Sequence, residues 1–377
     1  EQVRLGLAAE CNSQMRVPQT VRRVPLGRIV QHHGFVATSK LQSAPAVAGT
    51  TVLATDAASS RSMQVNRSVA VSTSDTGNLL SQDAPTALSG RFTLSDGQVM
   101  PLVGLGVYRV KTSGDVCYQA VRSALERGYR LIDTAAMYGN EQEVGRAIRD
   151  SGIPRSEIFV TTKIKPQDHG RGRTRKAGLQ SHHSLGIVYV DLLLMHSPTG
   201  GKILETWDDM CALRTEGLVR SVGVSNFGVQ HLDALAKYRP ESMPVVNQIE
   251  MHPLVYKTRA DTVAACIKYG IVLQAYGSLF GEQGSQGLKF FARPEVAAAA
   301  TARPDCSPAQ VLLRWALQHN FAIIPKSTHK ERIDENASLD HFHLSEEEMT
   351  ALDQMQGHLD EYWNPLRSDV DLGKVAQ

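Results

Sequence analysis

The sequence predicts an α/β protein, a closed (β/α)8 TIM barrel with an N-terminal β-hairpin and a largely irregular N-terminal extension. Short apolar runs alternate with segments of helical periodicity, which is the pattern of a parallel sheet covered by helices. Eight parallel units favour a closed barrel over a doubly wound open sheet, which stays the alternative. The eight apolar runs lie at 103–106, 130–133, 158–163, 190–196, 220–225, 244–250, 271–276 and 321–326.

The bulk composition is that of a globular chain. Of the 377 residues, 42% are hydrophobic and 21% are charged, so a packed core is expected. The net charge of +2 argues against a nucleic-acid-binding protein, which usually carries a concentrated basic face. No apolar run reaches the roughly 18 residues that a membrane span requires. The five scattered cysteines include no CxxC pair, so neither a disulfide framework nor a zinc site is predicted.

Two domains are predicted, a low-complexity extension over residues 1–90 and the barrel over residues 91–377. The extension is rich in Ser, Ala, Val, Thr and Arg, and its acids before Asp75 are only Glu1, Glu10 and Asp56. This composition fits an organelle transit segment, a disordered tail or a segment held by a protein partner. The compartment therefore stays open between the cytoplasm and an organelle, either a mitochondrion or a plastid.

The start of the barrel domain has clear local signals. Residues 91–101 alternate around Asp96-Gly97, which predicts a hairpin with a two-residue turn. Gly128 stands where the first barrel helix would stop. The basic run at 171–176 is interpreted as a solvated loop. The expected buried face of the first helix consists of Val116, Ala120, Val121, Ala124 and Leu125.

Polar side chains end three consecutive apolar runs. Asp133 ends the second run, Lys163 the third and His196 the fourth, and Tyr138 follows in the loop after Asp133. The C-terminal ends of barrel strands form one mouth, so these four side chains are expected to lie close together. A charged group at the end of a buried strand is costly unless it is paired. One such residue has a structural explanation, but three in succession predict a shared site.

These residue types suit the reduction of a carbonyl group. An ammonium group beside a tyrosine lowers the pKa of the phenol from its usual value of about 10. The aspartate keeps the lysine charged, and a neutral histidine can donate a hydrogen bond to a carbonyl oxygen. Together they would polarise a carbonyl and protonate the alkoxide that forms. They supply no electrons, so the hydride must come from a cofactor.

From about residue 91 onward, the chain resembles the aldo-keto reductase superfamily, including its prostaglandin F synthase and diketogluconate reductase-like members. The resemblance implies a (β/α)8 barrel that uses NADPH to reduce aldehydes and ketones. It also implies that Tyr138 is the general acid, that Lys163 and Asp133 tune it, and that His196 orients the substrate. The matching motifs are GYRLIDTAAMYGNEQEVGRAI, TTK at 161–163, LLLMHSP, VGVSNF and IPKSTHKERIDEN.

The resemblance also implies a set of NADPH-binding residues. Two cations and two hydroxyls at the start of a helix suit a dianionic phosphate, which favours NADPH over NADH. The implied contacts are Ser225, Asn226 and Gln248 with the carboxamide, Tyr276 with the nicotinamide ring, Ser278 and Leu279 with the pyrophosphate, Lys326, Ser327, Thr328 and Arg332 with the 2′-phosphate, and Glu335 and Asn336 with adenine.

The expected substrate pocket departs from the usual pattern of this family. Tyr108, Lys165 and Ser197 stand in segments where family members often carry a tryptophan. The more polar lining predicts polar or anionic carbonyl substrates rather than steroids. Tyr362 and Trp363 are expected to fold over the pocket. The alternatives are that Lys165 points to solvent and that the C-terminal pair packs against the side of the barrel.

The expected partner is a small-molecule carbonyl compound, and the resemblance implies a monomeric barrel. Nucleic acid, a membrane span and a metal site are not expected. One competing hypothesis is a reductase-like barrel that serves as a structural or cofactor-sensing subunit through residues 1–90. Another is alcohol oxidation or isomerisation at the same site.

Overall fold

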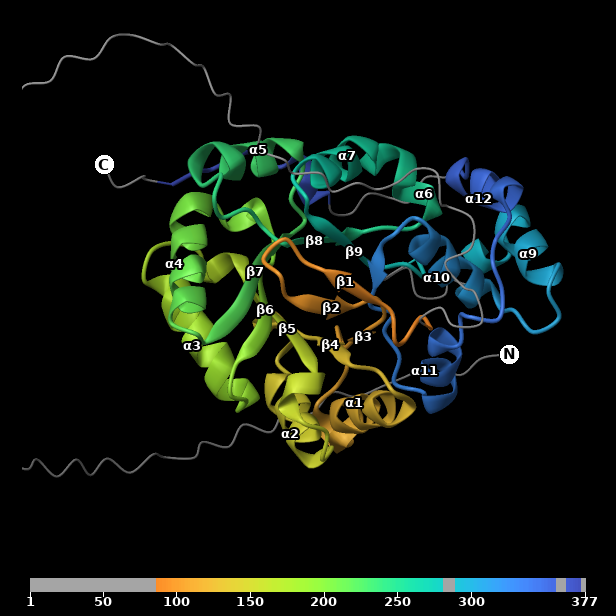
Figure 1. Ribbon diagram of the computed structural model, residues 1–377, viewed down its shortest axis with the longest axis horizontal. Helices are drawn as coiled ribbons and strands as arrows, with labels where there is room; N and C mark the ends of the chain where they lie inside the picture. Colours follow the sequence, from red (N-terminus) through yellow and green to blue (C-terminus); the bar gives the residue numbers. More distant parts are fainter. Residues whose placement is uncertain (1–85, 281–288, 357–363, 374–377) are drawn as a thin grey trace, which may run out of the picture. The chain divides into compact units, whose positions relative to one another are not determined.

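The computed structural model describes residues 86–280, 289–356 and 364–373 (Figure 1). The expectations for residues 1–85 and for Tyr362 and Trp363 lie outside these residues. Eight strands form one sheet in which each strand is parallel to its neighbours and adjacent to the next strand of the chain. They are β3 (Leu105–Gly106), β4 (Leu131–Asp133), β5 (Phe159–Ile164), β6 (Val190–Met195), β7 (Val219–Ser225), β8 (Val246–Glu250), β9 (Val272–Tyr276) and β10 (Ala322–Ile323).

The first and last strands close the sheet into a barrel. Parallel bridges join Val103 to Ile323 and Gly106 to Lys326. The Gly104 amide donates to the Ile323 carbonyl at 2.9 Å. A Cβ atom on Gly106 would lie 2.7 Å from the carbonyl oxygen of Ile324, so the seam admits only glycine at this point. The closed barrel is confirmed, and the open sheet is excluded.

Helices surround the strand ring in Figure 1. The first, α1, ends at Gly128 as predicted, with Gly128 in the left-handed region at φ 108°. Its buried face begins at Cys117, whereas Val116 is 36% exposed, so the prediction was wrong for Val116. The described helices are α1 (Val116–Arg127), α2 (Glu141–Asp150), α3 (Arg173–Leu185), α4 (Ile203–Thr215), α5 (Val229–Tyr238), α6 (Pro253–Tyr256), α7 (Ala260–Lys268), α9 (Pro294–Thr301), α10 (Pro308–Gln318), α11 (Lys330–Ala337) and α12 (Glu346–Asp353).

The basic run at 171–176 is not a loop throughout, because α3 begins at Arg173. Arg175 forms an ion pair with Glu216 at 2.9 Å. The carboxylate of Asp209 accepts hydrogen bonds from the amides of Gly172 at 2.6 Å and Arg175 at 3.0 Å. The run therefore lies against α4 and the residue that follows it, and Arg175 contributes its charge to that contact.

The predicted hairpin consists of β1 (Arg91–Thr93) and β2 (Val99–Pro101). The amide of Leu94 donates to the Gln98 carbonyl at 2.8 Å, and the amide of Gly97 donates to the Leu94 carbonyl at 2.9 Å. Three residues therefore connect the paired positions, and Gly97 is left-handed at φ 85°. The predicted hairpin is present, but its expected two-residue turn was wrong.

The hairpin covers the N-terminal end of the barrel, and Figure 1 shows it lying across the strand ring. Leu94 and Met100 are 2% and 0% exposed, and they pack with Leu131 and Phe159, the first residues of β4 and β5. The Ser221 hydroxyl donates to the carboxylate of Asp96 in the hairpin turn at 2.7 Å. One end of the barrel is thus filled, which leaves the C-terminal ends of the strands for a site.

The described chain begins just before the hairpin. Ala87 is buried, and its amide donates to the carboxylate of Asp340 at 2.6 Å. The boundary between an extension and the barrel stays a prediction. Within the described ranges, no helix has the length and apolar character needed to cross a membrane.

Candidate active site

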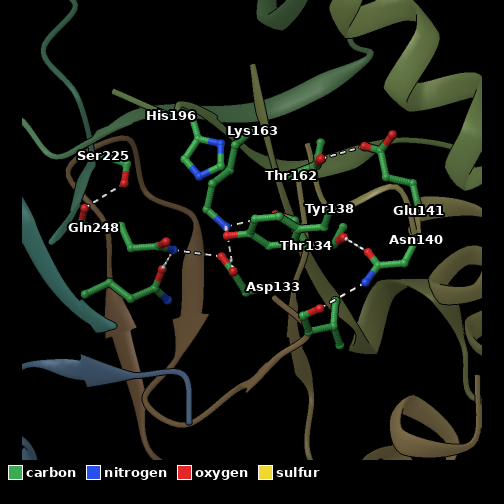
Figure 2. A network of polar contacts seen from close by, with 12 residues as sticks. Asp133, Thr134, Tyr138, Asn140, Glu141, Thr162, Lys163, His196, Ser225 and Gln248 are labelled. Atoms are coloured by element: carbon green, nitrogen blue, oxygen red, sulfur yellow. Dashed lines mark hydrogen bonds and ion pairs between the residues drawn. The ribbon is translucent and has the colours of Figure 1, made fainter. Parts of the chain in front are cut away.

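The four predicted catalytic side chains meet at the C-terminal mouth of the barrel (Figure 2). Asp133 is the last residue of β4, Lys163 is the next to last residue of β5, and His196 directly follows β6. Tyr138 ends a short 3-10 helix, Ala136–Tyr138, that follows β4. The parallel register of three adjacent strands therefore brings together residues that lie far apart in the sequence.

Lys163 is the centre of the cluster and is fully buried. Its ammonium nitrogen lies 2.5 Å from Asp133 Oδ1, 2.9 Å from the Thr134 carbonyl and 3.2 Å from the Tyr138 hydroxyl. An ammonium group has three hydrogens, and these three acceptors use all of them. The Tyr138 oxygen is thus an acceptor in this contact. Burial lowers the pKa of Lys163, and the charge of Asp133 opposes that shift.

His196 faces the same space. Its amide donates to the Ile164 carbonyl at 3.0 Å, and its ring meets the Tyr138 ring edge-on with centroids 5.7 Å apart. Burial, together with the nearby Lys163 charge, lowers the pKa of His196 to about 3. The imidazole is therefore neutral near neutral pH, and one ring nitrogen carries a hydrogen that it can donate. The buried Nδ1 atom has no hydrogen-bond partner among the described residues.

Asn140 holds the loop that carries Tyr138 in place through buried hydrogen bonds, and it was not among the predicted site residues. Asn140 is fully buried, and its side-chain nitrogen donates to the Val107 carbonyl at 2.9 Å. Its side-chain oxygen accepts from the Thr134 hydroxyl at 2.7 Å. On the solvent side, the ring of Tyr108 lies against Tyr138 with centroids 4.9 Å apart. Tyr108 is 39% exposed, so it forms part of the rim of the mouth.

A second polar group adjoins the first at the ends of β7, β8 and β9. Asn226 has a left-handed backbone at φ 63°, and its side-chain nitrogen donates to the Ser225 hydroxyl and to the His196 carbonyl, both at 3.0 Å. The Tyr276 hydroxyl donates to the Asn226 side-chain oxygen at 2.7 Å. The Ser225 hydroxyl donates to the Gln248 carbonyl at 2.8 Å. The structure thus brings four of the predicted cofactor residues together beside the catalytic cluster.

The Gln248 amide links the two groups. Its nitrogen lies 2.7 Å from Asp133 Oδ2 and 2.7 Å from Gln274 Oε1. Both amide hydrogens are therefore used inside the protein, and only the oxygen remains for a carboxamide N–H group. Gln274 was not predicted, although it is the single polar residue in the otherwise apolar run at 271–276.

The strand register places one of the predicted phosphate-binding residues. Gly106 pairs with Asp133 on one side and with Lys326 on the other, so Lys326 lies at the same height in the barrel as Asp133. Arg332 and Lys326 are exposed, and α11 begins four residues after Lys326. Of the other predicted cofactor residues, Ser278, Ser327 and Asn336 are buried, and Leu279, Thr328 and Glu335 are half-buried.

The side chains predicted to contact substrate have other partners. The Lys165 ammonium lies 3.6 Å from the Asp168 carboxylate. Ser197 is 1% exposed, and its hydroxyl accepts from the Thr199 amide at 3.2 Å, which caps the next 3-10 turn. Their contacts with a substrate stay a prediction. Among the described residues, no group of three or more His, Cys, Asp or Glu side chains could hold a metal ion.

Solved structures share this architecture. An aldo-keto reductase from a Medee basin deep-sea metagenome library is 37% identical, with a TM-score of 0.67, and the match covers 74% of this chain and 100% of that one. A Bombyx mori aldo-keto reductase, solved in complex with NADP, is 36% identical, with a TM-score of 0.63 and coverage of 70% and 92%.

Sequence relatives agree with the structural matches. An aldo-keto reductase from Mycolicibacterium vanbaalenii is 45% identical over 262 residues, which are 69% of this chain and 90% of that protein. A glyoxal reductase from Bacillus subtilis is 40% identical over 271 residues, with coverage of 72% and 94%. The sequence model of the Aldo/keto reductase family matches residues 103–356. The chain therefore belongs to the aldo/keto reductase family and is an oxidoreductase that acts on carbonyl or alcohol groups.

Proposed function

We propose that the protein reduces aldehydes and ketones to alcohols with NADPH, and that Tyr138 is the general acid. The observation that supports this most strongly is the geometry of the buried ammonium group. Lys163 donates to Asp133, to the Thr134 carbonyl and to the Tyr138 oxygen. A phenol that accepts from a cation is stabilised as its anion, so it gives up its own hydrogen more readily.

Each catalytic side chain then has a distinct role at the carbonyl oxygen of the substrate. NADPH, when bound, supplies the hydride. His196 is neutral and donates a hydrogen bond that orients the carbonyl oxygen. Tyr138 transfers its proton to the same oxygen as negative charge develops there. Lys163 stabilises the resulting phenolate, and Asp133 holds Lys163 in place.

The cofactor assignment rests on this chain's own donors and acceptors. The free oxygen of Gln248 and the side chains of Ser225 and Asn226 suit a carboxamide, which offers both N–H and C=O groups. The exposed Lys326 and Arg332 suit a 2′-phosphate near the start of α11. The NADP complex of the Bombyx mori relative supports the same choice.

The substrate proposal concerns polar carbonyl compounds. Tyr108 is the ring that lies on Tyr138 at the rim, and its hydroxyl adds polarity to that wall. One relative is named a glyoxal reductase, and glyoxal is a small polar carbonyl compound, which supports the same preference. We expect a short anionic aldehyde to be reduced with a higher kcat/KM than a steroid ketone. Equal kcat/KM values would contradict this substrate preference.

The test is NADPH oxidation by the purified protein over a panel of short anionic, aromatic and steroid carbonyls. Tyr138→Phe should lower kcat by about 10²- to 10⁴-fold while NADPH binding persists. The control is Tyr118→Phe, because Tyr118 lies outside the site and hydrogen-bonds Asp150 at 3.0 Å. If Tyr138→Phe keeps full activity, Tyr138 is not the acid. If the wild type binds NADPH but reduces nothing, the structural or cofactor-sensing hypothesis replaces this one.

A further inference from the structure

A chain of buried polar side chains runs from the catalytic lysine down into the barrel. Lys163 contacts Asp133 Oδ1 at 2.5 Å, and the other oxygen of Asp133 accepts from the Gln248 nitrogen at 2.7 Å. The same nitrogen donates to Gln274 Oε1 at 2.7 Å. The Gln274 nitrogen in turn lies 3.9 Å from Met100 Sδ, on the hairpin that fills the far end of the barrel. All five side chains are at most 3% exposed.

The carboxylate at the top of this chain determines which way each amide faces. A carboxylate only accepts hydrogen bonds, so Gln248 must present its nitrogen to Asp133. The second hydrogen of that nitrogen then requires an acceptor, which is Gln274 Oε1. Gln274 must therefore direct its own nitrogen downward, toward the thioether of Met100. Thioether sulfur is a weak acceptor, which suits the bottom of such a chain.

The hydrogen bonds of the Gln274 side chain go to Gln248 and Met100, and not to the four predicted catalytic side chains. Gln274 pairs directly with Gln248 across β8 and β9, and it is fully buried in a run of apolar residues. An apolar side chain of similar volume would fill the same space without burying an amide. Its amide oxygen accepts the second hydrogen of the Gln248 nitrogen, so that nitrogen is anchored by both of its hydrogens, one to Asp133 and one to Gln274.

We propose that Gln274 is a positioning residue of the catalytic site, which locks the Gln248 amide so that its nitrogen holds Asp133 and its oxygen faces the cofactor. The proposal rests on the proposed role of Tyr138 as proton donor. Gln274 acts through two intermediaries, first Gln248 and then the Asp133–Lys163 pair.

Removal of the Gln274 acceptor has a predictable direction. Gln248 loses one of its two anchors, so its bond to Asp133 weakens. The carboxylate is then less well compensated and attracts the Lys163 ammonium more strongly. Less positive charge acts on the Tyr138 oxygen, so the phenol keeps its proton to a higher pH and transfers it less readily.

The experiment compares Gln274→Met and Gln274→Glu with the wild type. Four quantities are measured: the pH profile of kcat, the KM for an aldehyde, the affinity for NADPH and the melting temperature. Methionine has a similar volume but no strong acceptor. Glutamic acid keeps an oxygen for Gln248, and burial keeps that carboxyl protonated near neutral pH. The control is Ser221→Ala, which removes another hydrogen bond between a strand and the hairpin, the partly buried one to Asp96.

Gln274→Met should lower kcat about tenfold and move the alkaline limb of its pH profile up by about half a unit. KM for the aldehyde should stay within about twofold, and NADPH affinity should fall because the Gln248 oxygen is no longer fixed. Gln274→Glu should have nearly the wild-type kcat near neutral pH, and Ser221→Ala should leave the pH profile of kcat unchanged.

A Gln274→Met profile that matches the wild type would overturn the positioning role. Equal profile shifts in Gln274→Met and Ser221→Ala would also overturn it, because both would then reflect a general loosening. The variant Tyr138→Phe separates a failure of the proposed function from a failure of the Gln274 role. If that variant retains activity, the proton donor has been misassigned, whereas activity lost in Tyr138→Phe and unchanged in Gln274→Met rejects the Gln274 role alone.

Discussion

The buried charge of Lys163 lowers the stability of the fold unless it is compensated, and the proposed proton transfer requires it. A fully buried ammonium group loses its hydration, and its compensation comes from Asp133, the Thr134 carbonyl and the Tyr138 oxygen. None of these partners can be removed without leaving a charge or a donor unsatisfied. The predicted catalytic arrangement is therefore also a determinant of stability.

Replacement of Lys163 by methionine should reveal both roles. It leaves the Asp133 carboxylate buried and unpaired, so the free energy of unfolding should fall by about 3–5 kcal/mol, and reductase activity should be lost. Urea denaturation gives the first value and NADPH oxidation the second. Lys165→Met is the matched control, because its pair with Asp168 is partly exposed and should contribute at most about 1 kcal/mol. Equal losses in the two variants would contradict this account.

His196 should make the stability of the protein depend on acid. Its pKa is lowered to about 3 in the folded chain, whereas in the unfolded chain it is near its usual value of about 6.5. The unfolded state thus binds the proton first, so stability is full above about pH 6.5 and falls as the pH drops toward 3, by at most about 1.4 kcal/mol per unit. His196→Gln should flatten this part of the curve of unfolding free energy against pH. A variant with the wild-type slope would show that other groups cause the acid sensitivity.

At this scale the sequence was informative where a side chain ends a strand. Asp133, Lys163 and His196 each close an apolar run, so the change of character is visible locally. Gln274 was missed because the residues next to it in the sequence do not indicate what a single polar side chain in an apolar run would contact. Its partner Gln248 lies 26 residues away, and only the pairing of β8 with β9 joins them.

In the hairpin, the Asp96-Gly97 pair predicted the position of the turn correctly but not its length. Asp96-Gly97 marks the turn correctly, and Gly97 adopts the left-handed conformation that the signal implies. The three-residue turn also makes tertiary contacts, because Leu94 is buried and Asp96 accepts from Ser221 on β7. Neither contact is visible in the eleven residues of the hairpin.

The packing of α2 on α3 depends on the absence of one side chain. A Cβ atom on Gly145 would lie 1.7 Å from the Leu185 carbonyl oxygen, which belongs to the backbone and cannot turn away. Gly145→Ala should therefore lower the free energy of unfolding by about 3 kcal/mol, measured by urea denaturation. Gly178→Ala is the control. Its Cβ would meet the flexible end of Leu213, so a smaller loss is expected, and an equal loss would refute the backbone explanation.

The whole barrel could be predicted because eight apolar runs alternate with helical segments, and that alternation is independent of any single boundary. The number of units also favoured a closed ring, but the contacts that close it could not be read from the sequence. They join Gly104 and Gly106 to residues near Ile323, at opposite ends of the domain. The assignment of residues 1–90 as an extension stays a prediction.

A chain that starts at Thr86 should keep the kcat/KM and the melting temperature of the full chain. The closing contacts of the barrel, the hairpin and the catalytic cluster all lie within the described residues from 86 onward. A chain that starts at residue 103 is the control. It lacks the hairpin, so Leu131 and Phe159 lose their cover and the melting temperature should fall. A loss of activity on removal of residues 1–85 alone would instead support a functional role for that segment.

The seam between β3 and β10 has a consequence for how the protein is made. The first barrel strand, β3, can pair with β10 only after the residues around Ile323 have left the ribosome. At translation rates of about 5–20 residues per second, the exposed edge of β3 waits on the order of 10–40 seconds. During that time the nascent chain presents an unpaired strand to other nascent chains, so the last strand to be synthesised protects the first.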